Sequence, residues 1–211
     1  MAIPDIAPYP MPGEKDLPES TPHWKPDPRR AALLIHDMQK YFVEPFLAHQ
    51  SPGRELIGNV VRLLRQCRAI GVPVVYTAQP GSMTDEQRGL LKDFWGPGMK
   101  ATPEHRRIID ELTPDERSRV FTKWRYSAFA RTDLLGHLRE LGRDQLVVCG
   151  VYAHVGCLMT AVDAFTHDVE PFLVADAVAD FSPEHHRMAV DYAAQRCAVV
   201  LSTEAALEHL R

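Results

Sequence analysis

Six short, continuously apolar segments recur along the chain, and segments with helical spacing separate them. The apolar segments span residues 31–37, 72–77, 119–123, 145–150, 170–175 and 197–202. Each is too short for a stable helix and rich in β-branched residues, and its unbroken hydrophobicity indicates a strand covered on both faces. Between them, residues 55–70 and 183–196 place apolar side chains at helical intervals. This alternation predicts an α/β protein, a three-layer αβα Rossmann-like fold with a six-stranded parallel sheet.

The pattern also predicts one domain preceded by an arm. Residues 1–28 are rich in proline and show little periodicity, and we interpret them as an extended arm lying on the domain. Residues 29–211 carry the strand and helix patterns and form the domain itself. A chain of 211 residues, 45% of them hydrophobic, is long enough to build one sizeable core.

Charge and sequence composition argue against several classes of protein. Lys and Arg number 24 against 28 Asp and Glu, which gives a formal net charge of −4. Such a mildly acidic chain suits neither a general nucleic-acid binder nor a polybasic membrane-surface protein. No apolar run approaches the roughly 20 residues of a membrane-spanning helix. The N-terminus lacks the basic start and apolar segment of a signal peptide, so we expect a cytoplasmic protein.

The sequence gives no sign of a bound metal or nucleotide cofactor. Its cysteines form no CxxC pair, and in a cytoplasmic chain we expect buried thiols rather than disulfides or a zinc site. These cysteines are Cys67, Cys149, Cys157 and Cys197. Neither GxGxxG nor GxxxxGK[ST] occurs, so the usual phosphate cradles are missing. We therefore expect neither a metal nor a cofactor.

Polar side chains stand where the predicted strands end, which is where ligands bind in such sheets. Asp37 ends the first strand, and Lys123 ends the third. We expect the two to meet across the crevice as a partly buried acid and base, a candidate active site. The alternatives are a turn aspartate and a lysine whose charged end reaches solvent. The fourth strand runs into a helix at 150–157, whose free N–H groups can hold an anion. Residues 78–102 form a long polar loop, which predicts a functional role.

Seven motifs along nearly the whole chain resemble the isochorismatase-like hydrolases. They are LLIHDMQKYF, YTAQP, FWGPGM, TKWRYSAF, GVYAHVGC, DAF and VADAVADFS. The resemblance implies a six-stranded parallel sheet, and for most members an Asp, Lys, Cys triad that hydrolyses amides. Asp37 and Lys123 match the first two positions, but the cysteine position falls at Gly156. Cys157 lies one residue further along, a rotation of roughly 100° on a helix, so we expect it to point away from the crevice.

Members with glycine at that position resemble the branch of the family that hydrolyses enol ethers. The resemblance implies that Asp37 protonates the vinyl methylene carbon and that Lys123 binds and orients a dianionic substrate. Further expected substrate contacts are Gln79, Arg88 and the N–H of Gly156, with Trp95, Phe42 and Tyr152 walling the pocket. A solvated Arg88 and ordinary core packing of the three aromatic residues are the alternatives. His36 and His154 are interpreted as structural. The pair His185 and His186 is interpreted as part of a surface helix without a metal.

Two reactions of this branch compete for the assignment. Residues 79–99 and 185–198 look closer to enzymes of phenazine-type secondary metabolism. These release pyruvate and trans-2,3-dihydro-3-hydroxyanthranilate from 2-amino-2-deoxyisochorismate. The alternative is a siderophore-pathway isochorismatase, which makes 2,3-dihydro-2,3-dihydroxybenzoate and pyruvate from isochorismate; MAIP and DAF favour it. A thiol amidase using Cys157 and a non-catalytic docking protein are further alternatives. The expected partners are a chorismate-derived small molecule and a second copy of the chain in a homodimer.

Overall fold

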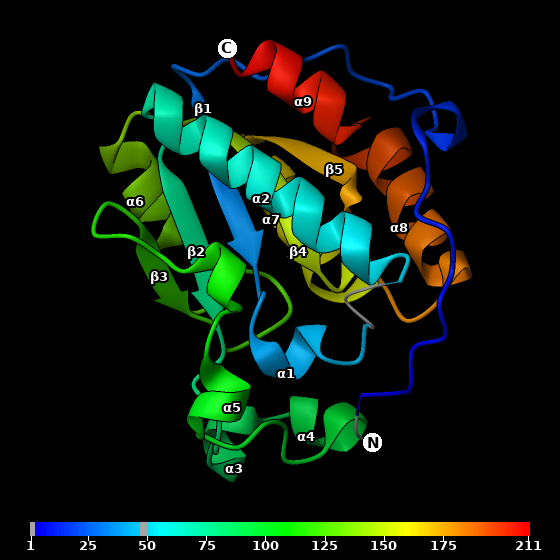
Figure 1. The fold of residues 1–211 in the computed structure, drawn as a ribbon. Helices are drawn as coiled ribbons and strands as arrows, with labels where there is room; N and C mark the ends of the chain where they lie inside the picture. The colour runs from blue at the N-terminus through cyan, green and yellow to red at the C-terminus, as the bar shows by residue number, and fades with distance from the viewer. Residues whose placement is uncertain (1–2, 47–49) are drawn as a thin grey trace.

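The computed structural model describes residues 3–46 and 50–211 and contains the predicted six-stranded sheet. Its strand order is β3-β2-β1-β4-β5-β6, and every neighbouring pair is parallel (Figure 1). The strands are β1 (Ala31–His36), β2 (Val74–Ala78), β3 (Arg119–Thr122), β4 (Gln145–Val151), β5 (Glu170–Ala179) and β6 (Val199–Leu201). All six coincide with the apolar segments of the sequence, so the predicted fold class is confirmed.

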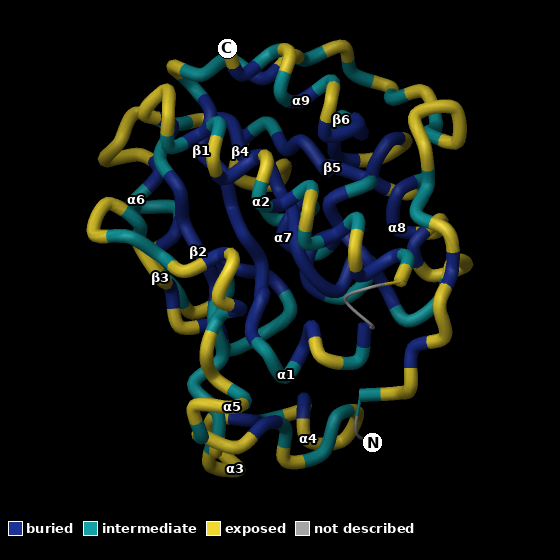
Figure 2. Tube along the Cα trace, viewed as in Figure 1, coloured by how far each residue is buried: buried dark blue, intermediate teal, exposed yellow. Residues whose placement is uncertain are grey.

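Helices cover both faces of the sheet and give the fold its three layers. The longer ones are α2 (Gly53–Ile70), α6 (Leu134–Glu140), α7 (Leu158–Thr166), α8 (Pro183–Arg196) and α9 (Thr203–His209). Leu33 and Ile35 of β1 pack into one core with α2 and α9, whereas Ala32 and Leu34 pack into a second core with α6, α7 and α8. This alternation follows from strand geometry, since successive side chains point to opposite faces. The central strands are accordingly buried on both sides (Figure 2).

Short elements occupy the connections at one end of the sheet and along the arm. They are η1 (Glu14–Asp16), α1 (Lys40–Val43), α3 (Asp85–Arg88), α4 (Leu91–Trp95), α5 (Pro103–Arg106), η2 (Asp110–Leu112) and η3 (Ala153–Cys157). Figure 1 shows α1, α3, α4 and α5 gathered beyond the carboxyl ends of β1 and β2. The expected irregular loop at 78–102 therefore contains two helical turns. A capping box between Thr84 and Gln87 begins the first of them.

Two strands differ from the expectation of short strands covered on both faces. β3 is an edge strand, and Arg119, Val120 and Thr122 are exposed. Among the residues that the structure describes, no strand pairs with its outer edge, and Phe121 is its one buried residue. β5 runs on to Ala179 because a register irregularity between Val148 and Gly150 of β4 realigns the pairing.

Residues 3–28 run along the outside of the domain past α8 and α9 (Figure 1). Tyr9 is buried, and its hydroxyl accepts a hydrogen bond from the Asp180 N–H at 2.8 Å. Thr21 N–H donates to the carbonyl of Ala194 at 2.9 Å. The division at residue 28 stays a prediction. Within the described residues, no helix combines the length and apolarity needed to cross a bilayer.

Candidate active site

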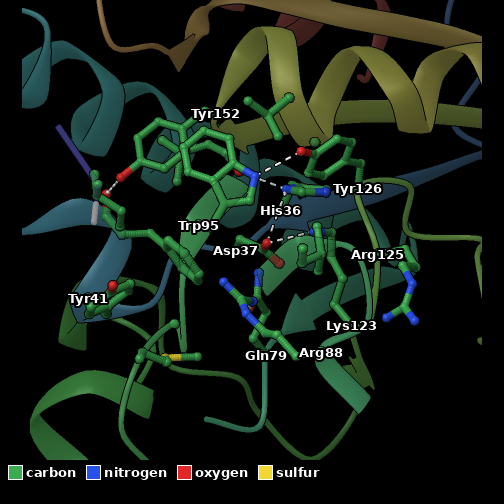
Figure 3. A pocket seen from close by; sticks show the side chains of 18 of the residues that line it. His36, Asp37, Tyr41, Gln79, Arg88, Trp95, Lys123, Arg125, Tyr126 and Tyr152 are labelled. Atoms are coloured by element: carbon green, nitrogen blue, oxygen red, sulfur yellow. Dashed lines mark hydrogen bonds and ion pairs between the residues drawn. The ribbon is translucent and has the colours of Figure 1, made fainter. Parts of the chain in front are cut away.

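One cavity opens at the carboxyl ends of β1, β2, β3 and β4, where the topology predicts a ligand site. About 630 Å³ of space lies between its walls, including the open solvent at its mouth. All eight residues that the sequence singled out as site residues line it. They are Asp37, Phe42, Gln79, Arg88, Trp95, Lys123, Tyr152 and Gly156. Figure 3 labels all of them except Phe42 and Gly156. The structure thus brings the predicted set together, while the role of each residue stays a prediction.

Asp37 and Lys123 form a buried ion pair at the base of this cavity. Lys123 Nζ lies 2.9 Å from Asp37 Oδ2, and the two residues are only 3% and 4% exposed. The two residues meet across the crevice as expected, although their strands are not neighbours, because β2 lies between β1 and β3. They meet since Asp37 adopts a left-handed backbone conformation (φ 50°) directly after β1. Thr77 of β2 fixes this turn by accepting from the Asp37 N–H and donating to its Oδ1 at 2.6 Å.

The surroundings of Asp37 act on its pKa in opposite directions. Burial is the largest influence and raises the pKa, because a charged carboxylate is poorly solvated there. Lys123, His36 and the Thr77 hydroxyl together outweigh burial, so the pKa of Asp37 lies below its ordinary value. The free site therefore holds a carboxylate at neutral pH. Any role as a proton donor requires that the carboxyl gain a proton once substrate is bound.

The segment between β2 and α4 supplies a cationic wall. Arg88 is 5% exposed, which contradicts the alternative of a solvated arginine. Its Nε donates to the carbonyl of Gly96 at 2.9 Å, and its Cζ lies where a side chain at position 98 would be. Gly98 combines this close contact with a positive φ of 76°. A side chain there would displace the guanidinium, so the glycines of this loop serve to seat Arg88 in the cavity.

Aromatic side chains form the remaining walls, including several that the sequence analysis did not single out. Tyr152 donates its hydroxyl proton to the carbonyl of Phe42 at 2.8 Å. Trp95 Nε1 donates to the hydroxyl of Tyr126 at 2.8 Å, which ties α4 to the segment after β3 (Figure 3). Phe181 lies against Tyr152 with ring centroids 4.3 Å apart. Tyr126 and Phe181 both stand in motifs quoted above, TKWRYSAF and VADAVADFS, which was the available signal.

Two expectations, one about the segment after β4 and one about α8, are wrong. The N–H of Gly156 donates to the Tyr152 carbonyl at 3.0 Å and cannot hold a substrate oxygen. The reason is that η3 begins at Ala153, which places Gly156 beyond the first turn, where free N–H groups end. His186 is 2% exposed rather than on the surface, with its Nδ1 3.0 Å from the Tyr9 hydroxyl.

His154, Asp180 and His185 lie close together beside Phe181. The rings of His154 and His185 are stacked, with centroids 4.4 Å apart and an angle of 11° between the planes. One possible ligand atom of each of the three residues lies within 4.8 Å of the others. The Asp180 carboxylate already accepts from the N–H groups of His154 and Phe181. It also lies 2.7 Å from His154 Nδ1. The Asp180 carboxylate therefore fixes the local backbone, and the expectation of no metal here stays a prediction.

Cys157 is separated from the cavity, as its displacement by one residue predicts. It packs into the second core with Leu34 and is fully buried. Burial raises its pKa well above the ordinary thiol value, and the same holds for Cys149. A buried, protonated thiol is a poor nucleophile.

We expect the native protein to be inert toward iodoacetamide, because all four cysteines are buried. The measurement is intact mass and activity after incubation at neutral pH. Urea-unfolded protein, in which all four thiols become available, is the positive control. Loss of activity that tracks alkylation of Cys157 in the folded protein would contradict this and favour thiol chemistry.

Comparison with known proteins agrees with this geometry. Residues 31–205 match the family described as the isochorismatase domain. The chain is 57% identical over 206 residues to the Pseudomonas aeruginosa phenazine biosynthesis protein PhzD1, covering 98% of this chain and 99% of that one. It is 55% identical to the Bacillus subtilis isochorismatase, over 100% of this chain and 68% of the relative. A cysteine hydrolase structure from Pseudomonas syringae shares the fold, with a TM-score of 0.82 at 24% identity and coverages of 92% and 97%. The chain therefore belongs to the isochorismatase family of hydrolases.

Proposed function

We propose that this enzyme hydrolyses the enolpyruvyl ether of 2-amino-2-deoxyisochorismate to pyruvate and trans-2,3-dihydro-3-hydroxyanthranilate. The observation that carries the proposal is a buried carboxyl, Asp37, facing a cavity in which glycine stands at the position of the family's nucleophile. A vinyl ether needs a positioned proton and a water molecule, not a nucleophilic side chain. The high identity to a protein named for phenazine biosynthesis supports the amino substrate.

The proposed reaction uses Asp37 as acid and then as base. The protonated carboxyl gives its proton to the vinyl methylene carbon, and the ether carbon becomes an oxocarbenium ion. Water adds to this carbon and loses a proton to the Asp37 carboxylate, which leaves a neutral hemiketal. The hemiketal then breaks its bond to the ring oxygen. That oxygen gains a proton and the hemiketal hydroxyl loses one, so that one water is consumed per pyruvate released.

The charges around the cavity support an anionic substrate. Lys123, Arg88 and Arg125 are cationic and line it together with Asp37. A guanidinium suits a carboxylate because two N–H groups can donate to two oxygens. A substrate carboxylate placed beside Lys123 would also offset the attraction that lowers the pKa of Asp37. Binding of the substrate itself would then favour the protonated acid that the reaction needs.

The two remaining alternatives fit the structure less well. An amidase using Cys157 would need its thiol in the cavity, whereas the thiol packs into the second core, away from the cavity. A docking protein without catalysis is favoured by a filled crevice beside Asp37, whereas a cavity that opens to solvent lies there.

A second candidate reaction is hydrolysis of isochorismate to 2,3-dihydro-2,3-dihydroxybenzoate and pyruvate. The two substrates differ by an amine for a hydroxyl at one ring carbon. An ammonium group would enter a cavity with three cationic side chains and one carboxylate, which electrostatically favours the hydroxyl substrate. The 55% identity to the Bacillus subtilis isochorismatase points the same way.

Side-by-side kinetics of pyruvate release decide between these substrates. Under the proposed function, which rests on the identity to the phenazine biosynthesis protein, we expect turnover of both and a kcat/KM for the amino substrate about tenfold higher, against the electrostatic preference for the hydroxyl group. A ratio reversed by the same factor would assign the isochorismate reaction instead. Failure to release pyruvate from either compound by the folded protein would refute the enol-ether proposal altogether.

We further propose that the enzyme is a cytoplasmic homodimer. The sequence suggests residues 191–200 as the subunit contact. Most apolar residues of this range pack inside the domain, but Tyr192 and, one turn earlier on α8, Met188 are 47% and 45% exposed. Exposed apolar groups of this size on one helix favour contact with a second copy. Sedimentation velocity measures the state directly.

A further inference from the structure

His36 is a buried imidazole beside the proposed acid, and the sequence analysis assigned it no more than a structural role. It is 0% exposed, and its Nδ1 lies 2.8 Å from the carbonyl of Val151. Because a carbonyl only accepts, Nδ1 must carry the hydrogen. Nε2 is buried as well, and a backbone contact with Tyr126 also acts on the ring. Burial, helped by nearby Lys123 and opposed by Asp37, lowers the pKa of His36 to about 4, so the ring is neutral at physiological pH.

Gly150 and Gly156 pack directly against His36. A Cβ at position 156 would overlap His36 Cε1, far inside van der Waals contact. A Cβ at position 150 would overlap the His36 carbonyl oxygen, and Gly150 also has a positive φ of 113°. The ring and the backbone of His36 are therefore each packed against a glycine. The glycine in the nucleophile position leaves the space that the imidazole occupies.

The packing of His36 bears directly on Asp37. The two residues are adjacent, and His36 Nδ1 lies 3.9 Å from Asp37 Oδ2. The Val151 carbonyl holds one edge of the ring and Gly156 abuts another, so the ring has little freedom to rotate. Asp37 leaves the strand in a left-handed conformation, which is unfavourable and persists only where its surroundings hold it. The Thr77 hydroxyl holds the backbone N–H and Oδ1 of Asp37, and the fixed ring of His36 lies on the preceding residue.

We propose that His36 is a positioning residue for the Asp37 carboxyl and that His36 and Gly156 act as a matched pair. This inference rests on the proposed enol-ether hydrolysis. The ring aims the acid and keeps water from the space behind it, which preserves the burial that raises the pKa of Asp37. It also fixes the chemistry of the site, because residue 156 cannot bear any side chain while the imidazole is in place.

The test uses His36→Ala, His36→Asn, Gly156→Ala and the double variant H36N/G156A. Asparagine can still donate to the Val151 carbonyl, but it lacks the Cε1–Nε2 edge that touches Gly156. We expect His36→Ala to lower kcat about 100-fold, the order of loss that a displacement of about 1 Å produces at a reacting group. KM should stay within about threefold, because substrate binding groups are untouched. His36→Asn should recover at least part of kcat.

Two further readouts separate positioning from simple packing. A general acid loses activity as pH rises through its pKa. Because the His36 ring is neutral at the assay pH, its removal takes away little positive charge, and the main change in His36→Ala is the entry of water that weakens the effect of burial. The fall in kcat should therefore begin at lower pH in this variant. Gly156→Ala should lower Tm by about 4 °C or more with His36 present. In the His36→Asn background, Gly156→Ala should change Tm little. Its methyl group should also fill the space that the imidazole leaves, so the double variant should have a pH profile close to that of the wild type. His23→Ala, at an exposed histidine of the arm, is the matched control.

Each outcome has one meaning. Wild-type kcat and pH profile in His36→Ala would overturn the positioning role. An equal loss of Tm from Gly156→Ala in both backgrounds would overturn the matched pair. Absence of pyruvate release by the wild type would instead refute the proposed function, and the Tm comparison would still test the pair because it needs no substrate.

Discussion

Replacement of Asp37 by asparagine should lower kcat for pyruvate release by about 10³-fold, within the range that a positioned general acid contributes. The amide keeps the size of the side chain and can still contact Thr77, but it cannot give a proton to carbon. KM should change little if Lys123 and the other cations carry the binding. Pyruvate formation followed continuously, with each variant checked by circular dichroism, gives both constants.

Asp168→Asn is the matched control for this variant. Asp168 is exposed and lies just before β5, at the opposite end of the strands from the cavity. Its left-handed backbone (φ 59°) is one that asparagine tolerates well. We expect wild-type kinetics from it. Turnover by folded Asp37→Asn close to that of the control would remove Asp37 from the chemistry and with it the proposed mechanism.

The fold could be predicted from the sequence because the signal is local and repeated. A strand buried on both faces cannot alternate between polar and apolar residues. Six such segments, separated by helical patterns, are compatible with few architectures. The errors arise where burial depends on a neighbour. Nothing in residues 119–123 shows that their strand stands at the edge, because strand order is set by the crossover connections and not by the strand itself.

The candidate site shows the same division. Asp37 and Lys123 were predictable because charged residues at the ends of buried strands need partners. The position of β2 between their strands was not predictable, and neither was the hydrogen bond that Thr77 donates to Asp37. The contact between His36 and Gly156 joins residues 120 positions apart, and only the packed structure reveals that the ring needs the missing side chain. The N–H of Gly156 was assigned wrongly because the first turn of the helix begins three residues earlier, at Ala153.

Lys123 carries the second large effect, because its removal changes both binding and the charge state of Asp37. Replacement by methionine keeps the length of the side chain in its buried position but leaves a carboxyl without its cation. Burial then dominates and the pKa of Asp37 rises above its ordinary value. We expect kcat/KM to fall about 100-fold, mainly through KM, as binding of the anionic substrate weakens. The loss of activity with rising pH should also move to higher pH than in the wild type.

The same variant gives a test in stability that needs no substrate. In the wild type the pKa of Asp37 is depressed on folding, so the pair contributes stability that is present above the unfolded pKa and lost as pH falls through the folded pKa. In Lys123→Met the folded pKa is raised, so the sign reverses and stability is lost as pH rises through it. At pH 8 the free energy of unfolding should drop by up to about 3–5 kcal/mol, the cost of leaving a buried charge unpaired. At pH 5 the drop should be smaller, because the carboxyl is protonated there. Adding Asp37→Asn removes the titrating group, so the double variant should lose this difference between pH 5 and pH 8. If Lys123→Met is destabilised equally at both pH values, the Asp37 carboxyl is not the buried group that the mechanism requires.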